Sequence, residues 1–149
     1  YKVLELLGQA GASAATDRSK GFQEIFGAAN INQSITANWS RAEGQSVTEA
    51  FLTAQGNPAK VLVFAANDEM ALGAVEALKA STSVTEYHVV GFDAIEDAVN
   101  AVNAGEMDAT VAQQPVKIGS VAAQLALDYL SGKTVAEASP VEIALVTKK

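Results

Sequence analysis

The chain has 149 residues, of which 49% are hydrophobic and 18% are charged, so it can bury the core of one domain and is not disordered. Its formal net charge of −7 lacks the basic footprint that a nucleic-acid partner requires. The sequence contains no Cys, which excludes disulfides, thiolate nucleophiles and Cys-based zinc sites.

Residues 1–7 form an apolar run that starts without an initiator Met, which predicts a fragment of a longer protein. In a fragment, the lack of a signal peptide says nothing about localisation. No stretch approaches the roughly 18 apolar residues of a membrane span.

Apolar, strand-like runs alternate with helical stretches from residue 2 to residue 112. We expect strands at 2–7, 31–37, 60–65, 87–92 and 108–112, and helices at 14–28, 41–55, 68–79 and 95–103. The strand runs are nearly continuous in Val, Leu, Ile, Phe and Ala, as is typical of parallel strands covered on both faces. This alternation predicts an α/β fold with an open, mostly parallel, doubly wound sheet.

The pattern changes after Gln113-Gln114-Pro115. A helix is expected at 117–130, followed by a polar loop and a last strand at 141–146. We therefore divide the chain into a lobe, residues 1–113, and a tail, residues 114–149.

Polar and aromatic residues gather where the predicted strands end. In an open α/β sheet, ligands lie outside the carboxyl ends of the strands. The residues at these ends are Ala14 and Arg18 after the first strand, Trp39 after the second, Asn67 after the third, Asp93 after the fourth and Gln113 after the fifth. A carboxylate, a guanidinium and two amides can bind the hydroxyls of a small sugar, and an indole can cover its apolar ring face. The set therefore predicts a monosaccharide site.

Four of these residues also have a simpler explanation. Asn67 and Asp68 are favoured helix caps. Arg18 could be a solvated helix residue, Trp39 could belong to the core, and Asp93 could be a turn residue or a cap. Only their shared location favours a site.

Catalytic functions lack a motif. The single His, His88, lies inside a predicted strand and is interpreted as structural, with no Ser or Asp in a triad-like arrangement. The loop Gly8–Gly11 lacks the spacing of a phosphate-binding loop. We expect a binding protein and not an enzyme, with no metal and no cofactor.

Four runs of the sequence carry a family likeness, over essentially the whole chain. They are Gly11–Phe22, Ala66–Gly73, Val89–Asp93 and Ala109–Gln113, and they resemble the ribose-binding proteins of the type I periplasmic binding protein family. The resemblance implies a flavodoxin-like lobe, the C-terminal one of two, and a periplasmic location. It places the sugar contacts on Arg18, Asn67, Asp93 and Gln113, the stacking aromatic on Trp39, and a small pocket-lining residue on Ala14. Ribose binders commonly have Phe where Trp39 stands, a difference that keeps a stacking ring but changes the pocket volume. Ribose is therefore still the expected ligand, with another pentose or a related monosaccharide as the alternative.

The resemblance also implies a missing partner. Half of the sugar site and the helix before Tyr1 are absent, so we expect weak sugar binding or none by this chain alone. Helix 117–130 is expected to dock on the lobe in place of the missing helix, through apolar residues at Ile118, Val121, Ala122, Leu125 and Tyr129. The competing arrangement is a homodimer in which two chains cover each other's exposed faces.

Two functions remain open at this point. The first is sugar capture for an ABC-type importer, with the lobe docking on a membrane permease. The alternative is the effector-binding domain of a LacI-type transcription regulator, which shares the fold and similar motifs. A third class, a stand-alone flavodoxin-like enzyme or receiver domain, shares only the topology. A receiver needs an acidic cluster after its first strand, and residues 8–10 are not acidic.

Overall fold

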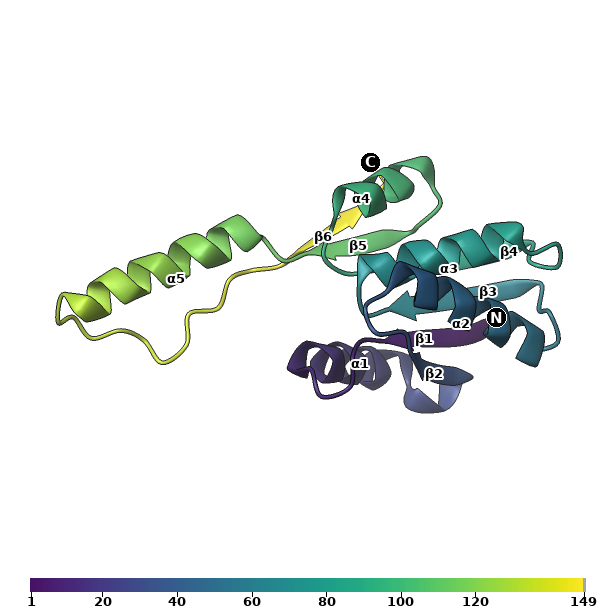
Figure 1. Cartoon of the computed structure of the whole chain (residues 1–149), viewed down its shortest axis with the longest axis horizontal. Coiled ribbons are helices and arrows are strands. Elements are labelled where there is room, and N and C mark those ends of the chain that lie inside the picture. The colour runs from purple at the N-terminus through teal and green to yellow at the C-terminus, as the bar shows by residue number, and fades with distance from the viewer. Residues whose placement is uncertain (149) are drawn as a thin grey trace.

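The computed structural model describes residues 1–148 as an α/β lobe from which one helix projects (Figure 1). The strands are β1 (Lys2–Leu7), β2 (Gln33–Thr36), β3 (Lys60–Ala65), β4 (Glu86–Val90), β5 (Ala109–Ala112) and β6 (Ala144–Thr147). The helices are α1 (Ser13–Phe26), the 3₁₀ turn η1 (Ala28–Asn30), α2 (Arg41–Ala54), α3 (Asp68–Ala80), α4 (Glu96–Ala104) and α5 (Pro115–Leu130). The predicted alternation is confirmed, with element boundaries shifted by a few residues.

The six strands form one sheet in the order β2-β1-β3-β4-β5-β6. The first five strands pair in parallel, and β6 pairs antiparallel with β5. The sheet is therefore mostly parallel, as the sequence predicts. Because parallel strands end at the same edge, the loops after β1 to β5 come together there.

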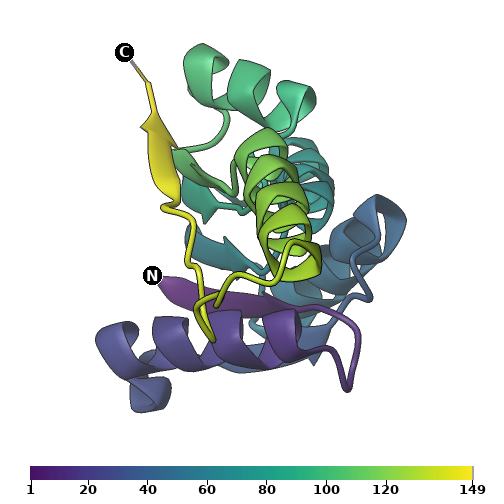
Figure 2. The same cartoon turned by 90° about the vertical axis from the view of Figure 1, so that its left-hand side faces the viewer.

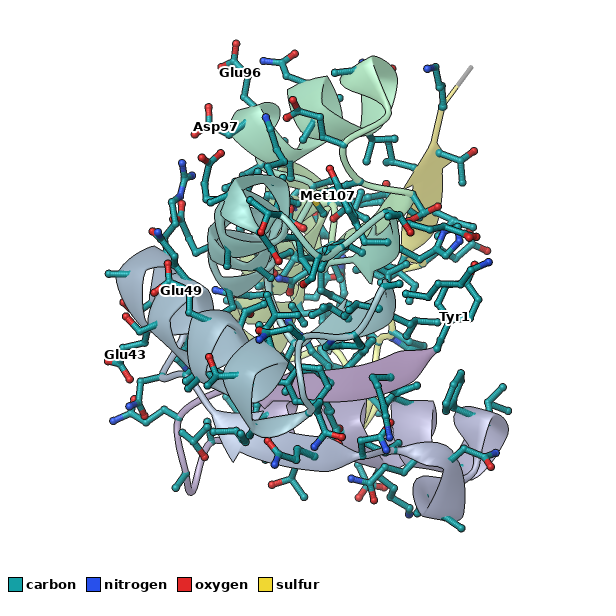
Figure 3. The ribbon with its side chains drawn as sticks, turned by 90° about the vertical axis from the view of Figure 1, so that its right-hand side faces the viewer. Tyr1, Glu43, Glu49, Glu96, Asp97 and Met107 are labelled. Atoms are coloured by element: carbon teal, nitrogen blue, oxygen red, sulfur yellow. The ribbon has the colours of Figure 1, made fainter. Side chains whose placement is uncertain are left out.

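Helices α2, α3 and α4 cover one face of the sheet and enclose the core. The buried strand residues on this face include Leu4, Leu6, Val63 and Val89. Figure 3 shows Met107 inside this layer, while acidic residues of α2 and α4 lie on its outer side. Helix α3 approaches α2 closely because Gly73 has no side chain: a Cβ there would overlap the carbonyl oxygen of Arg41.

The opposite face of the sheet is covered only in part. Helix α1 lies over it beside β1, and Phe22 of α1 stacks on Phe64 of β3. Beyond α1, a groove of about 530 Å³ is open and is lined by apolar residues that include Val90, Val111 and Leu145. The expected cover on both faces is thus incomplete, because the chain supplies one helix to this side and three to the other.

Helix α5 corrects the expectation that segment 117–130 docks on the lobe. None of the residues of Pro115–Leu130 is buried, and Figures 1 and 2 show the helix leaving the carboxyl end of the sheet. The reason is local: Gln114 adopts a left-handed φ of 55°, which turns the chain away from the sheet before Pro115 begins the helix. Strand β6 alone returns to the lobe, beside β5.

Among residues 1–148, no helix has both the length and the apolar character needed to cross a bilayer. The same residues contain no group of three or more His, Cys, Asp or Glu side chains that could hold a metal ion.

Candidate functional site

The structure brings five of the six predicted site residues to one edge of the sheet. Trp39, Asn67, Asp93 and Gln113 follow β2, β3, β4 and β5, and Arg18 reaches the same edge from α1. Ala14 lies exposed in the first turn of α1, one turn before Arg18 and on the same helix face.

Arg18 is the centre of the cluster. Its side chain is only 15% exposed, and its guanidinium donates to the carbonyl oxygen of Ala66 at 2.7 Å. Its second terminal nitrogen lies 3.5 Å from Oδ1 of Asp93. Burial lowers the pKa of Arg18, and the charges of Asp93 and Asp68 oppose this effect. An arginine remains charged under all ordinary conditions, so the site holds a fixed cation.

Two aromatic rings flank the guanidinium. The Cζ atom of Arg18 lies 3.8 Å from the ring centroid of Phe92 and 5.7 Å from that of Trp39. The indole of Trp39 lies against Gly8, where a Cβ would overlap its six-membered ring. Glycine at this position therefore lets the indole lie flat beside the end of β1.

Asp93 supplies the carboxylate of the cluster. The side-chain amide of Gln113 donates to Oδ1 of Asp93, the same oxygen that faces Arg18. Within residues 1–148 both contacts use Oδ1, which leaves Oδ2 to accept from a ligand hydroxyl. Burial raises the pKa of Asp93, while Arg18 and Gln113 act to lower it.

Asn67 has two roles at once. Its side-chain oxygen accepts from the backbone N–H of Met70 at 3.0 Å, so it caps α3 as the simpler explanation predicts. Its amide nitrogen donates to the carbonyl oxygen of Trp39 at 3.4 Å, which ties the loop after β2 to the loop after β3. Asp68, the other proposed cap, turns its carboxylate inward instead.

Strained backbone is concentrated at this edge. Non-glycine residues with positive φ include Asn38 and Trp39 after β2 (49° and 64°), Asp93 and Ala94 after β4 (119° and 52°), and Gln114 after β5. Such conformations persist only where the surroundings fix them, and they gather at binding and catalytic sites. This strain is a second indication, independent of side-chain chemistry, that the edge is a ligand site.

Sequence reasoning missed two contributors. Phe92 carries the stacking of Arg18, and its position beside Asp93 in Gly91-Phe92-Asp93 was the available signal. Arg41 links the first turns of three helices, because it begins α2 and its guanidinium binds Glu69 of α3 at 2.8 Å and Asp97 of α4 at 2.9 Å. These ion pairs fix the helix N-termini beside the site.

His88 lies apart from the cluster. Its Nδ1 atom lies 2.9 Å from Oδ1 of Asp108, and its side chain is 45% exposed beside Tyr1. The Asp108 carboxylate is the main reason that the pKa of His88 is raised. The contacts link β4 to the residue before β5.

Comparison with known proteins identifies the family. Residues 1–134 match the family described as "Periplasmic binding protein domain". The chain belongs to this family. The members of this family that resemble the chain are binding proteins of ABC transport systems, and they are not enzymes.

Several relatives are named for sugars. The ribose import binding protein of Escherichia coli is 43% identical over 150 residues, covering 99% of this chain and 50% of the relative. That of Haemophilus influenzae is 41% identical over 149 residues, with the same coverage. This chain thus spans about half the length of these relatives.

Solved structures agree in fold. A periplasmic solute-binding protein from Actinobacillus succinogenes with bound D-allose superposes with a TM-score of 0.89 at 32% identity, covering 99% of this chain and 53% of that one. A Caulobacter myo-inositol-binding protein superposes with a TM-score of 0.85 at 31% identity, covering 98% and 51%. The flavodoxin-like lobe predicted from the sequence is thereby confirmed.

Proposed function

We propose that the edge cluster is one wall of a monosaccharide site, in a periplasmic protein that delivers its sugar to an ABC-type importer. The contacts of Arg18 with Asp93, Phe92 and Ala66 carry this proposal. They hold a charged donor beside an ionisable acceptor, and the indole of Trp39, with its ring centroid 5.7 Å from the Arg18 Cζ atom, offers a ring face next to them. These are the groups that bind vicinal hydroxyls and an apolar ring face.

Ribose is the sugar that the sequence relatives favour. The relatives with 41–43% identity are ribose import binding proteins, whereas structural neighbours at 31–32% identity include proteins with bound D-allose, myo-inositol and L-arabinofuranose. The sugar contacts assigned to this chain are Arg18, Asn67, Asp93 and Gln113, with Trp39 and Ala14 lining the pocket. The transport proteins among its relatives also favour import over the regulator alternative.

The site is half of an enclosure. A small-molecule site usually buries about 70–90% of its ligand, and one open sheet edge cannot do so. We therefore expect ribose affinity in the millimolar range or weaker for the chain alone. A hybrid carrying the first half of the E. coli relative supplies a second wall and is expected to bind far more tightly.

Calorimetric titration of ribose, allose and myo-inositol into the chain and the hybrid tests the proposal. Asp93→Asn removes one charged acceptor and should weaken ribose binding by the hybrid at least about tenfold. The matched control is Asp128→Asn on α5, which should leave it unchanged. Equal affinities for the two variants would contradict the assignment of Asp93. Sub-micromolar ribose binding by the chain as a monomer would contradict the half-site.

We propose further that a second copy covers the apolar surfaces of the chain when it stands alone. Each copy offers two of them, one side of α5 and the groove beside α1. A stable interface buries roughly 1,200–2,000 Å² in total, and a two-fold dimer that places α5 of each copy in the groove of the other covers all four surfaces at once.

Light scattering tests the dimer, since one chain has a mass of 15.4 kDa. Leu125 lies on the same side of α5 as Ile118, so Leu125→Ser should shift the measured mass towards that of the monomer. Leu127→Ser lies on the opposite side and serves as the control. A monomer at micromolar concentration, before any substitution, would overturn this arrangement.

A further inference from the structure

Asp68 is a buried carboxylate beside the site, without being one of the proposed sugar contacts. Its side chain and that of Thr110 on β5 are fully buried. The hydroxyl of Thr110 donates to Oδ1 of Asp68 at 2.6 Å, and the backbone N–H of Ile95 donates to Oδ2 at 2.9 Å. Both carboxylate oxygens are therefore engaged inside the protein.

These bonds hold the turn between β4 and α4 on both sides of Asp93. The backbone N–H of Ala94 donates to the Thr110 hydroxyl at 3.1 Å, and the N–H of Asp68 donates to the carbonyl oxygen of Phe92 at 2.8 Å. Asp68 and Thr110 thus bind Phe92, Ala94 and Ile95, which surround Asp93.

The held turn is strained at its centre. Asp93 has a φ of 119° and Ala94 a φ of 52°, conformations that are unfavourable in non-glycine residues. Only fixed surroundings maintain them, and the buried bonds of Asp68 and Thr110 provide such surroundings. This conformation places the Asp93 carboxylate against Arg18 and Gln113.

Burial and hydrogen bonding act on the pKa of Asp68 in opposite directions. Burial raises its pKa, although the bonds from Thr110 and Ile95 act to lower it. A carboxyl whose folded pKa is raised stabilises the fold below its unfolded value, about 3.9, and this contribution is lost as the pH rises through the folded pKa. At neutral pH the charge thus works against stability, while the two donors around it are satisfied by the ionised form.

We propose that Asp68 and Thr110 are positioning residues that hold the Phe92–Ile95 turn so that Asp93 faces Arg18 and Gln113. The ligand-binding consequence rests on the proposed function, because that function assigns Asp93 to the sugar. The positioning itself can be measured without sugar.

Thr110→Val tests the positioning, because valine keeps the volume of threonine and removes the hydroxyl. Amide exchange measured by NMR should become at least about tenfold faster at Ala94 and Ile95, and the carboxyl ¹³C resonance of Asp93 should shift. Thr110→Ser restores the hydroxyl and should return both readouts towards their original values. Asp68→Asn keeps one acceptor and should give a smaller change at the same residues.

Thr48→Val is the matched control for a buried threonine. Thr48 is also fully buried, but its hydroxyl binds the carbonyl oxygen of Gly44 within α2. Loss of the Thr48 hydroxyl should leave amide exchange at Ala94 and Ile95 unchanged. Amide exchange in β1 and β3 reports whether each variant is folded. If Thr110→Val does not fold, Asp68→Asn carries the test.

Unchanged exchange at Ala94 and Ile95 in both Thr110→Val and Asp68→Asn would overturn the proposal, as would equal changes in the serine and valine variants. In the hybrid, Thr110→Val should also weaken ribose binding about tenfold, whereas Thr110→Ser should keep a ribose affinity close to that of the unsubstituted hybrid. A hybrid that binds no sugar while the turn still responds to Thr110→Val would contradict the sugar site and support the positioning.

Discussion

Helices α3 and α5 are both rich in apolar residues, yet their environments are opposite. In α3, nine of the 13 residues are buried, including Met70, Val75 and Leu78. In α5, none of the 16 residues is buried, and Leu127 and Tyr129 are 62% and 70% exposed. An apolar pattern thus predicts a helix in both cases, but it predicts burial only where the chain also brings the helix onto a facing surface.

The difference follows from what each helix can reach. Helix α3 lies between two parallel strands of the sheet, so its connections return it to the core. Helix α5 follows the last parallel strand, and the rest of the tail only brings the chain back to β6 beside β5. The lobe offers an open apolar groove beside α1, but the turn at Gln114 directs α5 away from it.

Hydrogen exchange should show the largest contrast between the two helices. A 16-residue helix without tertiary packing is marginally stable, so in the monomer, which Leu125→Ser favours, α5 amides should exchange close to the unprotected rate. Amides of β1 and β3 open only with the whole lobe and should exchange at least about 10³-fold more slowly. Protection in α5 comparable with that in β1, in a monomeric sample, would mean that the helix docks after all.

Leucine truncation should repeat the contrast in stability. Leu78→Ala opens a cavity under α3 and should lower the free energy of unfolding by about 2–5 kcal/mol. Leu127→Ala, the same change on exposed α5, should alter it by no more than about 0.5 kcal/mol. Urea titration of both variants measures this, and similar losses would show that α5 belongs to the folded core.

Substitutions at the N-termini of α3 and α5 should show a smaller difference in the free energy of unfolding. Asn67→Ala removes the side-chain acceptor for Met70 and should destabilise the lobe by about 1 kcal/mol. Gln114 precedes α5 without a side-chain cap, so Gln114→Ala should change lobe stability by less than about 0.5 kcal/mol. Thermal unfolding of the two variants gives the comparison, and an unchanged melting temperature for Asn67→Ala would count against the cap.

The smallest effect is expected in the pH dependence of the unfolding free energy of the lobe near neutral pH. Asp108, with Glu86, raises the pKa of His88 above its usual 6.5. A raised histidine pKa stabilises the fold below the unfolded value, and this contribution is lost as the pH rises through the folded value. The unfolding free energy should therefore fall above pH 6.5, by less than about 1 kcal/mol because the pair is exposed. His88→Gln should remove this slope, and a slope that remains would exclude the His88–Asp108 pair as its cause.

The sequence predicts the parallel lobe well because each strand and helix carries its own period and its own end signals. It also predicts the positions of Arg18, Trp39, Asn67, Asp93 and Gln113 at the strand ends, and their gathering follows from the strand order. It does not reveal that Arg18 stacks on Phe92, because ring stacking depends on side-chain directions that residue type does not fix. The turn held by Asp68 was also missed, since its bonds join residues far apart in the chain.

Hydrophobic periodicity, turn residues and strand–helix alternation are local properties, and they determined the fold class and the edge at which a ligand site would form. The tertiary structure decided which partners each side chain has and where α5 goes. Asp68 could have capped α3 from its sequence position, and only the arrival of Thr110 and Ile95 from other elements turned its carboxylate inward. Helix α5 could have docked by its apolar pattern, and only the direction of the chain at Gln114 carried it away from the sheet. The first outcome depends on contacts between distant residues, and the second on a backbone turn at one residue; the apolar pattern of a helix encodes neither.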